Sequence, residues 1–504
     1  MDNDTLSKLN PWWRSRSGFL DDPSLAALER VPVRFDRSSE VAFEPAPDAI
    51  YTLRGPRQAG KTTILKQFLA RLASQGVAPA DLLYLSCEFE TDVGLAKTLR
   101  SWLDDRRGPA RRFIVLDEAA DVVDWPLVLR QLWNYGYLRN TTLVVSGSHA
   151  LDLRRATETL PGRRGEGGRP RHAPPLNQVL LPVSFREYAL ARIDGLREVA
   201  AAGGAPWMRA ADLARSPAFG AAASDLLPFA TDLHRAFREY LLCGGFPIPA
   251  QALAHTGSIP PEAYAAHVGA AGSDLTRYGL SEVSAAQIAR RIVQVLSTPV
   301  SWNTLAATTD IRSHTTAKSY AEALEAAFLV YSIAPFDLSS KRPVDRRERK
   351  LYPSDPFVVH SLRQWGRPTP DPYRESVEFA NDPARLGLLL EAAVASALAR
   401  DSLPGIFSGL AVHHRLAYLK TRGGREVDFV VRDDDLYTPV EVKSSAASKV
   451  DRKAMSLVGP GVIVTLQETD RSSRPRVIEA PYFLFLLGPK ARKRARPRRR
   501  AGKR

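Results

Sequence analysis

Apolar runs alternate with helical repeats along the first third of the chain. A buried-strand pattern at residues 49–55 leads through a glycine-rich turn into a helical pattern at residues 64–75. Further apolar runs follow at residues 81–88, 111–119 and 141–148. Because strands and helices alternate, we expect an α/β fold with a parallel sheet and helices on both faces.

The pattern changes beyond residue 284. Helical stretches at residues 285–297, 301–310 and 313–328 precede a strand-like run at 329–336, and Ser313 is expected to cap the third helix. Three helices followed by strands predict a winged-helix-like module.

A third pattern marks the carboxyl end. A long apolar helix is expected at residues 385–401, followed by two alternating strands at 426–431 and 438–443. These elements predict a separate small α/β domain.

The turn after the first strand carries the spacing G-x-x-x-x-G-K-[ST]. Backbone N–H groups of such a turn wrap a triphosphate, the Lys61 side chain reaches the β and γ phosphates, and the Thr62 hydroxyl is placed for Mg²⁺. We therefore predict a site for ATP and Mg²⁺ at this turn. Its residues are Gly55, Pro56, Arg57, Gln58, Ala59, Gly60, Lys61, Thr62 and Thr63.

Polar residues end two of the later strands. Asp117 and Glu118 follow four apolar residues, so Asp117 is predicted to hold Mg²⁺ and Glu118 to polarise the attacking water. The alternative is a helix N-cap aspartate at a strand end. Ser146 ends the next strand and is predicted to sense the γ phosphate, with an ordinary Ser-Gly turn as its alternative.

Six motifs in this order carry a family resemblance: GPRQAGKTT, FIVLDEA, LVVSGS, LPGRRG, LLPVSFREY and LLCGGFP. The chain resembles prokaryotic AAA-type ATPases whose C-terminal region was catalogued as a domain of unknown function. The resemblance spans nearly the whole chain, including NPWW at residues 10–13. It implies an ATPase module, a winged-helix-like middle and a C-terminal fold similar to PD-(D/E)xK nucleases.

These observations divide the chain into six regions. They are an N-terminal segment (1–48), a P-loop AAA-type ATPase core (49–190), a helical lid with an Ala- and Gly-biased insertion (191–283), a winged-helix-like module (284–365), a PD-(D/E)xK-like domain (366–488) and a disordered basic tail (489–504).

Arginines in the glycine-rich loop at residues 160–175 are candidates for phosphate chemistry. Arg163 or Arg164 is predicted to act as an arginine finger, in trans if the chain forms a homo-oligomer. The alternative is a charged, solvated loop.

The third helix of the middle module is the candidate DNA reader. It would offer Arg312, His314, Thr315 and Lys318 to DNA. Because the helix has one lysine and then turns acidic and apolar, a scaffold role is the favoured alternative. The basic segment at residues 339–350 is interpreted as a wing or loop.

The C-terminal domain contains a candidate metal site. If the loop between its two strands has an even number of residues, Asp428 faces Glu441 or Lys443; an odd number removes the site. Two converging carboxylates favour Mg²⁺ or Mn²⁺, and Lys443 would orient or deprotonate water. The spacing resembles the PD-(D/E)xK pattern, with Val-Asp in place of Pro-Asp and Glu391 carried over as the helix carboxylate.

Charge and composition complete the prediction. The net charge is +15, but residues 490–504 hold ten Lys or Arg and no acid, which leaves +5 for the rest. This tail is interpreted either as a nucleic-acid arm or as a solubilising terminus.

Neither a membrane span nor a secretory signal is expected, so a cytoplasmic location is the default. Cys87 and Cys243 are expected to be buried, reduced thiols.

The predicted function is ATP hydrolysis by an AAA-type ATPase with a nuclease-like C-terminal domain, acting on or near DNA. The alternative is an ATP-dependent regulatory switch that binds a protein partner while the C-terminal domain is catalytically silent.

Overall fold

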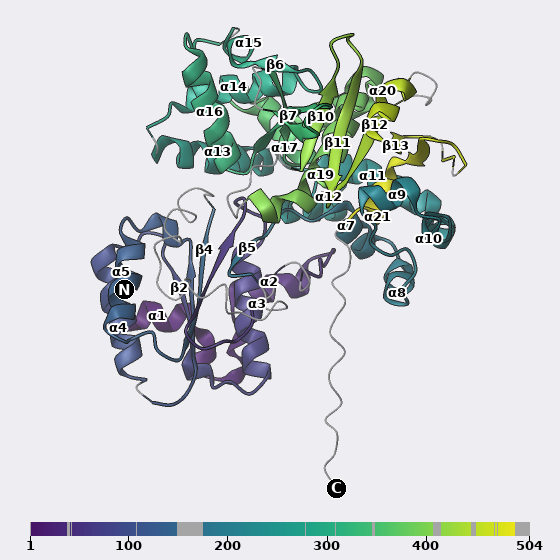
Figure 1. Ribbon diagram of the computed structural model, residues 1–504. Helices are drawn as coiled ribbons and strands as arrows, with labels where there is room; N and C mark the ends of the chain where they lie inside the picture. The colour runs from purple at the N-terminus through teal and green to yellow at the C-terminus, as the bar shows by residue number, and fades with distance from the viewer. Residues whose placement is uncertain are drawn as a thin grey trace.

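The computed structural model shows two bodies, an N-terminal one and a larger one formed by the rest of the chain (Figure 1). No helix among the described residues combines the length and apolar character needed to cross a membrane. The described residues are 2–37, 41, 43–106, 108–148, 175–277, 279–307, 309–344, 348–406, 415–444, 450–467, 469–470 and 472–488.

The N-terminal body is built on a five-stranded parallel sheet in the order β2-β3-β4-β1-β5. Helix α3 packs on one face, and α4 and α5 pack on the other, since successive strand residues enter opposite cores. The predicted parallel sheet with helices on both faces is confirmed. The elements are β1 (Ala49–Arg54), α3 (Lys61–Ser74), β2 (Leu82–Ser86), α4 (Asp92–Asp104), β3 (Arg112–Asp117), α5 (Trp125–Asn134), β4 (Thr141–Gly147) and β5 (Asn177–Val179).

The N-terminal segment contains helices α1 (Asn3–Leu9) and α2 (Pro23–Arg30). Helix α1 and the residues that follow it cover the free edge of β2, while α2 packs against α3. The Asn10 amide donates to the Tyr84 carbonyl at 2.9 Å and accepts from the Tyr84 N–H at 2.7 Å. The indole N–H groups of Trp12 and Trp13 both donate to the Leu82 carbonyl. The NPWW motif therefore satisfies edge groups that would otherwise be open to pairing with another strand.

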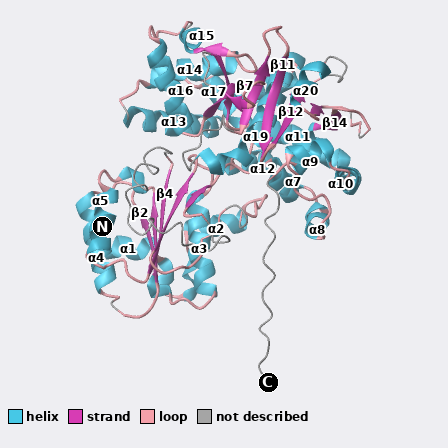
Figure 2. Cartoon of the chain, viewed as in Figure 1, coloured by secondary structure: helices cyan, strands magenta, loops and turns pink. Residues whose placement is uncertain are grey.

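A single sheet runs through the second body (Figure 2). Its order is β14-β13-β12-β11-β10-β7-β9-β6, and β8 pairs with β7. The parallel pairing of β7 with β10, Ala334 opposite Ala417, joins the strands of the middle region to those of the C-terminal region. The strands are β6 (Val300–Ser301), β7 (Val330–Asp337), β8 (Arg342–Pro343), β9 (Glu348–Pro353), β10 (Leu416–Lys420), β11 (Glu426–Asp433), β12 (Leu436–Val442), β13 (Val462–Thr465) and β14 (Arg476–Glu479).

One hydrophobic cluster extends from Val183 to Leu487 through the second body. The regions predicted at 191–283, 284–365 and 366–488 all contribute to this core. The helices are α7 (Phe185–Arg192), α8 (Leu196–Ala201), α9 (Ala210–Arg215), α10 (Ala218–Leu226), α11 (Ala230–Cys243), α12 (Pro247–Thr256), α13 (Pro261–Arg277), α14 (Glu282–Gln294), α15 (Trp302–Ala306), α16 (His314–Ala326), α17 (Pro356–Gln364), α18 (Pro372–Asn381), α19 (Pro383–Ile406), α20 (Arg452–Val458) and α21 (Ala480–Leu486). A smaller cluster, formed mainly by Ala417, Val427, Val430, Met455 and Ile463, lies between the C-terminal strands and α20.

The predicted helices of the middle region are present as α14, α15 and α16. Ser313 occupies the N-cap position of α16, although its hydroxyl faces Thr315 and caps no backbone N–H. The four candidate DNA-reading side chains are exposed, so their role stays a prediction. Of the two interpretations of residues 339–350, a wing or a loop, the strand pairing fits the wing, because β8 and β9 both pair antiparallel with β7. The end of the segment is not exposed as a basic loop would be, since Lys350 on β9 is fully buried.

The Ala- and Gly-biased insertion packs on the C-terminal strands. The Ala211 N–H donates to Asp433 Oδ2 at 3.0 Å, and the Arg215 guanidinium donates to the Tyr437 carbonyl at 3.0 Å. Arg209 forms an ion pair of 2.8 Å with Asp434. These contacts join segments more than 200 residues apart, which local composition does not show.

The GGFP motif is a close junction between α11 and α12. A side chain on Gly244 would meet Asp355, and one on Gly245 would meet the Val183 backbone. Asp355 is buried and accepts from the N–H groups of Gly245 and Phe357. Cys243, beside this motif, and Cys87 are both buried and free, as predicted.

A pH-dependent stability is expected from Asp355. Burial raises the pKa of this carboxyl to about 7 from 3.8, against the effect of its two N–H donors. The folded chain therefore keeps a proton that the unfolded chain loses, and the resulting stabilisation disappears as the pH rises towards 7. Asparagine does not titrate. From pH 5 to pH 7, the unfolding free energy of Asp355→Asn should rise relative to wild type by about 2 kcal/mol.

Urea unfolding of both proteins at the two pH values measures this change. The acceptor lost in the asparagine variant adds an offset that does not depend on pH. A constant difference in unfolding free energy across this range would show that Asp355 is ionised throughout.

Candidate active site

The glycine-rich turn between β1 and α3 forms the phosphate loop. Gly55 is required because a side chain there would meet the Leu180 carbonyl carbon and oxygen, and Gly60 because its φ is +94°. Gly60 is also the N-cap of α3, and no side chain caps that end. The free N–H groups of α3 and its dipole therefore favour an anion at this turn.

The Lys61 side chain folds onto the phosphate loop and contacts Glu118. Its ammonium donates to the carbonyls of Gly55 and Pro56 at 3.1 and 3.2 Å and lies 3.1 Å from Glu118 Oε1. The Ser148 N–H donates to the other Glu118 oxygen at 3.0 Å. Burial alone would raise the pKa of Glu118, but Lys61 brings it below the ordinary value. The predicted phosphate-binding lysine and catalytic glutamate are thus an ion pair here.

Three hydroxyl groups donate hydrogen bonds to the Asp117 carboxylate at the end of β3. Thr62 Oγ1 donates to Asp117 Oδ2 at 2.5 Å, and the Tyr84 hydroxyl donates to the same oxygen at 2.8 Å. Ser146 donates to the other oxygen and accepts from the Glu118 N–H at 3.1 Å. Thr62 and Asp117 converge as a Mg²⁺ site requires. Ser146 positions both acids, so a direct contact with the γ phosphate stays a prediction.

A cleft of about 510 Å³ lies beside these residues and is large enough for a nucleotide. The phosphate loop from Arg57 to Thr63 and Glu118 line one part of it. Apolar side chains from the N-terminal segment and from α12 line another part and offer a surface for a base: Leu28, Val33, Phe35, Pro247 and Ile248.

The N-terminal segment and α12 are tied together at this cleft. The Val33 N–H donates to Gln251 Oε1 at 3.1 Å, and the Gln251 amide donates back to the Val33 carbonyl. Sequence reasoning missed Val33 and Gln251, because no local pattern marks a contact across 218 positions. It also missed Arg37 and Tyr84. A smaller cavity of about 180 Å³ includes only Pro56 from the loop, so we assign the nucleotide to the larger cleft.

The C-terminal candidate residues also converge. β11 and β12 are joined through a two-residue loop, and their register, Phe429 opposite Val440, places Asp428 opposite Glu441. The loop is therefore even, which is the condition under which Asp428 and Glu441 face each other. Lys443 lies 2.7 Å from Glu441 Oε1 and 3.9 Å from Asp428 Oδ2.

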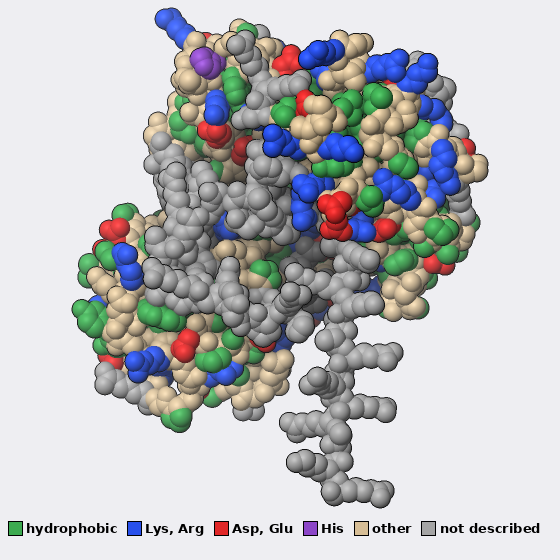
Figure 3. Space-filling model, in the orientation of Figure 1, with side chains coloured by type: hydrophobic (Ala, Val, Ile, Leu, Met, Phe, Trp, Pro, Cys, Tyr) green, Lys and Arg blue, Asp and Glu red, His purple; other side chains and the backbone are tan. Residues whose placement is uncertain are grey.

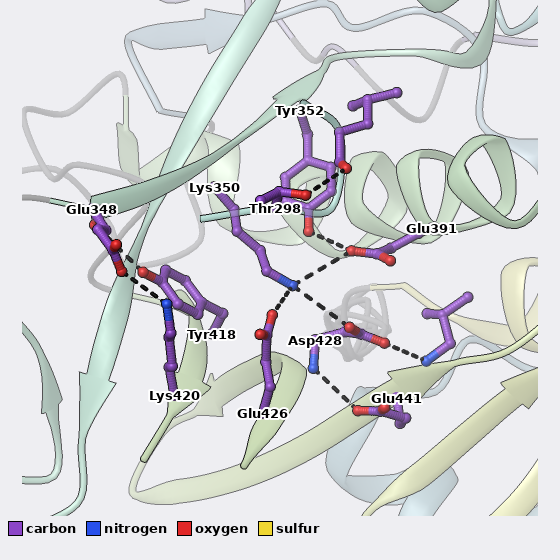
Figure 4. Close-up of polar contacts among 12 residues, drawn as sticks. Thr298, Glu348, Lys350, Tyr352, Glu391, Tyr418, Lys420, Glu426, Asp428 and Glu441 are labelled. Carbon is purple, nitrogen blue, oxygen red and sulfur yellow. Dashed lines mark hydrogen bonds and ion pairs between the residues drawn. The ribbon is translucent and has the colours of Figure 1, made fainter. Parts of the chain in front are cut away.

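An unpredicted lysine lies among these carboxylates (Figure 4). The Lys350 ammonium is 3.7 Å from Glu391 Oε1, 3.5 Å from Asp428 Oδ1 and 2.7 Å from Glu426 Oε1. Across the described residues, no three Asp, Glu, His or Cys side chains are arranged to hold a metal ion. The predicted metal site of Glu391, Asp428 and Glu441 is therefore not supported, because a fixed cation lies between two of its ligands.

Burial is the largest influence on the pKa values of Glu391, near Lys350, and Glu441, near Lys443. It raises the pKa of Glu391 and of Glu441 to about 7, and the neighbouring Asp428 charge adds to the rise. Burial would lower the pKa of Lys350, but the three surrounding carboxylates outweigh it and raise that pKa. Lys350 is therefore charged at neutral pH.

Two predicted features lie outside the described residues: the arginine finger candidates Arg163 and Arg164, and the basic tail at 489–504.

Three family models match parts of the chain. An AAA domain matches residues 47–189, a domain of unknown function (DUF8612) matches 234–369, and a second domain of unknown function (DUF4143) matches 386–481. No curated protein sequence matches the chain.

Solved structures similar to the chain include two point variants of RuvB from Thermotoga maritima. They are 14% and 15% identical to it, and each alignment covers 66% of this chain and 89% of the RuvB chain. Both TM-scores are 0.22, so the likeness carries no conclusion about how the regions of this chain are arranged.

Proposed function

We propose that this chain, whose residues 47–189 form an AAA-type P-loop ATPase domain, hydrolyses ATP and uses the reaction to rearrange its second body on or near DNA. The observation that carries the proposal is the convergence of Lys61, Thr62, Asp117 and Glu118 beside a cleft of nucleotide size.

ATP binding begins with an exchange of partners at Lys61. The ATP phosphates replace Glu118 as the partner of the Lys61 ammonium, because this lysine already lies at the loop that wraps the phosphates. Mg²⁺ held by Thr62 and Asp117 would supply charge neutralisation on the phosphates. Glu118, released from Lys61 and still held by the Ser148 N–H, then polarises the attacking water.

An ion-pair chain connects the cleft to the second body. Arg37 lines the cleft and pairs with Glu187 Oε1 at 3.2 Å, while Arg400 of α19 pairs with Glu187 Oε2 at 3.2 Å. Glu187 also closes the capping box of α7. A change at Arg37 on ATP binding is therefore passed to α19, the helix that carries Glu391.

The nucleic-acid part of the proposal depends on charge. Figure 3 shows Lys and Arg side chains gathered on the second body, in the part where α20 packs on β11 and β12. The exposed basic residues of this part include Arg422, Arg425, Arg432, Arg452 and Lys453. Such a surface attracts phosphate backbones without reading sequence.

A second candidate function is a switch in which ATP occupancy controls binding of a protein partner and the C-terminal domain is catalytically silent. The position of Lys350 among the carboxylates favours it. In both candidates, the ATPase domain is the same.

ATP turnover with and without DNA tests the proposal. We expect turnover by wild type, stimulation by duplex or single-stranded DNA, and loss of about 100-fold or more in Lys61→Ala. Lys97→Ala is the matched control, because Lys97 is exposed on α4 of the same domain. Tight nucleotide retention with negligible turnover under all conditions would refute hydrolysis and leave the switch.

A further inference from the structure

Glu391, Asp428 and Glu441 form a cluster that we call the acidic centre. Lys350 contacts this centre, although it lies on a strand that the sequence assigns to the middle region. It lies on β9 opposite Ile333 of β7, with an exposed fraction of 0%. Tyr352, two residues on and on the same face, donates its hydroxyl to Glu391 Oε1 at 2.6 Å. β9 thus supplies both a cation and a hydrogen-bond donor to the acids of α19 and β11 (Figure 4).

The carboxylate oxygens that a divalent metal would need are already engaged. Asp428 Oδ1 faces Lys350, while Asp428 Oδ2 accepts from the Val442 N–H at 2.9 Å and faces Lys443. Glu441 Oε1 pairs with Lys443, and Glu441 Oε2 accepts from the Asp428 N–H at 3.1 Å. With Glu391 Oε1 bonded to Tyr352, five of the six oxygens have a partner inside the protein.

Converging buried carboxylates require a compensating cation. A catalytic metal site leaves its ligands free for an ion that comes and goes, together with water or substrate. Here the compensating charge is covalently attached and excluded from solvent.

We infer that Lys350 takes the place of a divalent metal, so that the acidic centre of the C-terminal domain is an internal ionic junction between the middle and C-terminal regions and not a metal-dependent nuclease site. This inference is independent of ATP hydrolysis at the phosphate loop. It predicts that removing the lysine charge converts the junction into a metal site.

The test compares full-length wild type with Lys350→Met, with Mn²⁺ alone as the probe. The methionine variant should melt about 5–10 °C below wild type in EDTA, because breaking a buried ion pair leaves charges uncompensated. It should bind one Mn²⁺ per chain more than wild type, counted by electron paramagnetic resonance, and should regain several degrees on adding Mn²⁺. Adding Asp428→Asn should abolish the extra site.

Lys420→Met is the matched control. Lys420 is a half-exposed lysine of β10 that pairs with Glu348 at 3.0 Å, so its loss should change neither Mn²⁺ stoichiometry nor melting temperature appreciably. Comparing Mn²⁺ counts between variants removes any contribution from the phosphate-loop site, which is common to all of them. Unchanged ATP turnover in Lys350→Met would show that the ATPase domain is folded.

A charge-balanced double variant covers the case in which Lys350→Met fails to fold. Lys350→Met combined with Glu391→Gln removes one charge of each sign and should recover soluble, folded protein. A comparison that leaves Lys350 in place also decides the question. A Mn²⁺ site in wild type that disappears in Glu391→Gln, or Mn²⁺-dependent DNA cleavage that disappears in Glu441→Ala, would overturn the inference.

Discussion

Replacing Glu118 with glutamine should lower kcat for ATP by about 100- to 1000-fold while ATP binding is retained, since general base catalysis contributes an effect of this size. Glutamine keeps the shape of the side chain and its acceptor for the Ser148 N–H, but it cannot take a proton from water. It also weakens the pair with Lys61, which lies 3.1 Å away, so Lys61 is released to the phosphates more readily. Single-turnover hydrolysis together with equilibrium binding of ATP separates the two effects.

Asp124→Asn is the control for this prediction. Asp124 is exposed, follows Glu118 by six residues and caps no backbone N–H of α5. Its replacement should leave kcat and ATP affinity unchanged. If Glu118→Gln retained wild-type kcat, the assignment of Glu118 as the base would be wrong and another group would have to polarise the water.

Asp22→Ala should lower the unfolding free energy by about 3–5 kcal/mol, the cost of leaving a buried charge without its partner. Asp22 Oδ2 lies 2.8 Å from the Lys66 ammonium, and the exposed fractions of the two side chains are 2% and 9%. Asp22 Oδ1 also caps α2 by accepting from the N–H groups of Ser24 and Leu25. Urea unfolding of the full chain, followed by tryptophan fluorescence, measures the loss.

Two further variants separate the buried charge from the other contacts. Asp21→Ala changes the exposed neighbouring acid and should cost little. Asp22→Asn combined with Lys66→Met keeps the cap and removes both charges, so it should recover most of the lost stability. If the double variant were as unstable as Asp22→Ala, packing and not the unpaired Lys66 would account for the loss.

The ATPase core and its site were largely predictable from the sequence. The strands ending at Arg54, Asp117 and Gly147 are near the predicted positions, because each is a continuous apolar run buried on both faces. A parallel sheet aligns the carboxyl ends of its strands, so the phosphate loop, the acids and Ser146 had to meet at one edge. The Tyr84 contact with Asp117 was missed, because a tyrosine in an apolar strand looks like core.

The C-terminal centre was predictable only within its own hairpin. Alternation and loop parity are local properties, and they limited the residue facing Asp428 to Glu441 or Lys443 for an even loop; the observed register selects Glu441. Lys350 is interpreted from the sequence as part of a basic wing or loop, because the segment Glu348–Pro353 shows no alternation of apolar and polar residues. Its burial does not alternate either. Nothing local indicated that this strand joins the C-terminal sheet.

The sequence by itself determined the order of elements and the phosphate loop, because each follows from local patterns over fewer than about 20 residues. It limited the residue facing Asp428 to Glu441 or Lys443, and the strand register selected Glu441. Only the tertiary structure decided that the middle and C-terminal regions share one sheet and one core, and that Lys350 lies among the carboxylates. The physical reason is that pairing of β7 with β10 and burial of Lys350 depend on contacts between segments about 80 residues apart. Such contacts depend on the packing of the whole body, and short-range patterns do not record them.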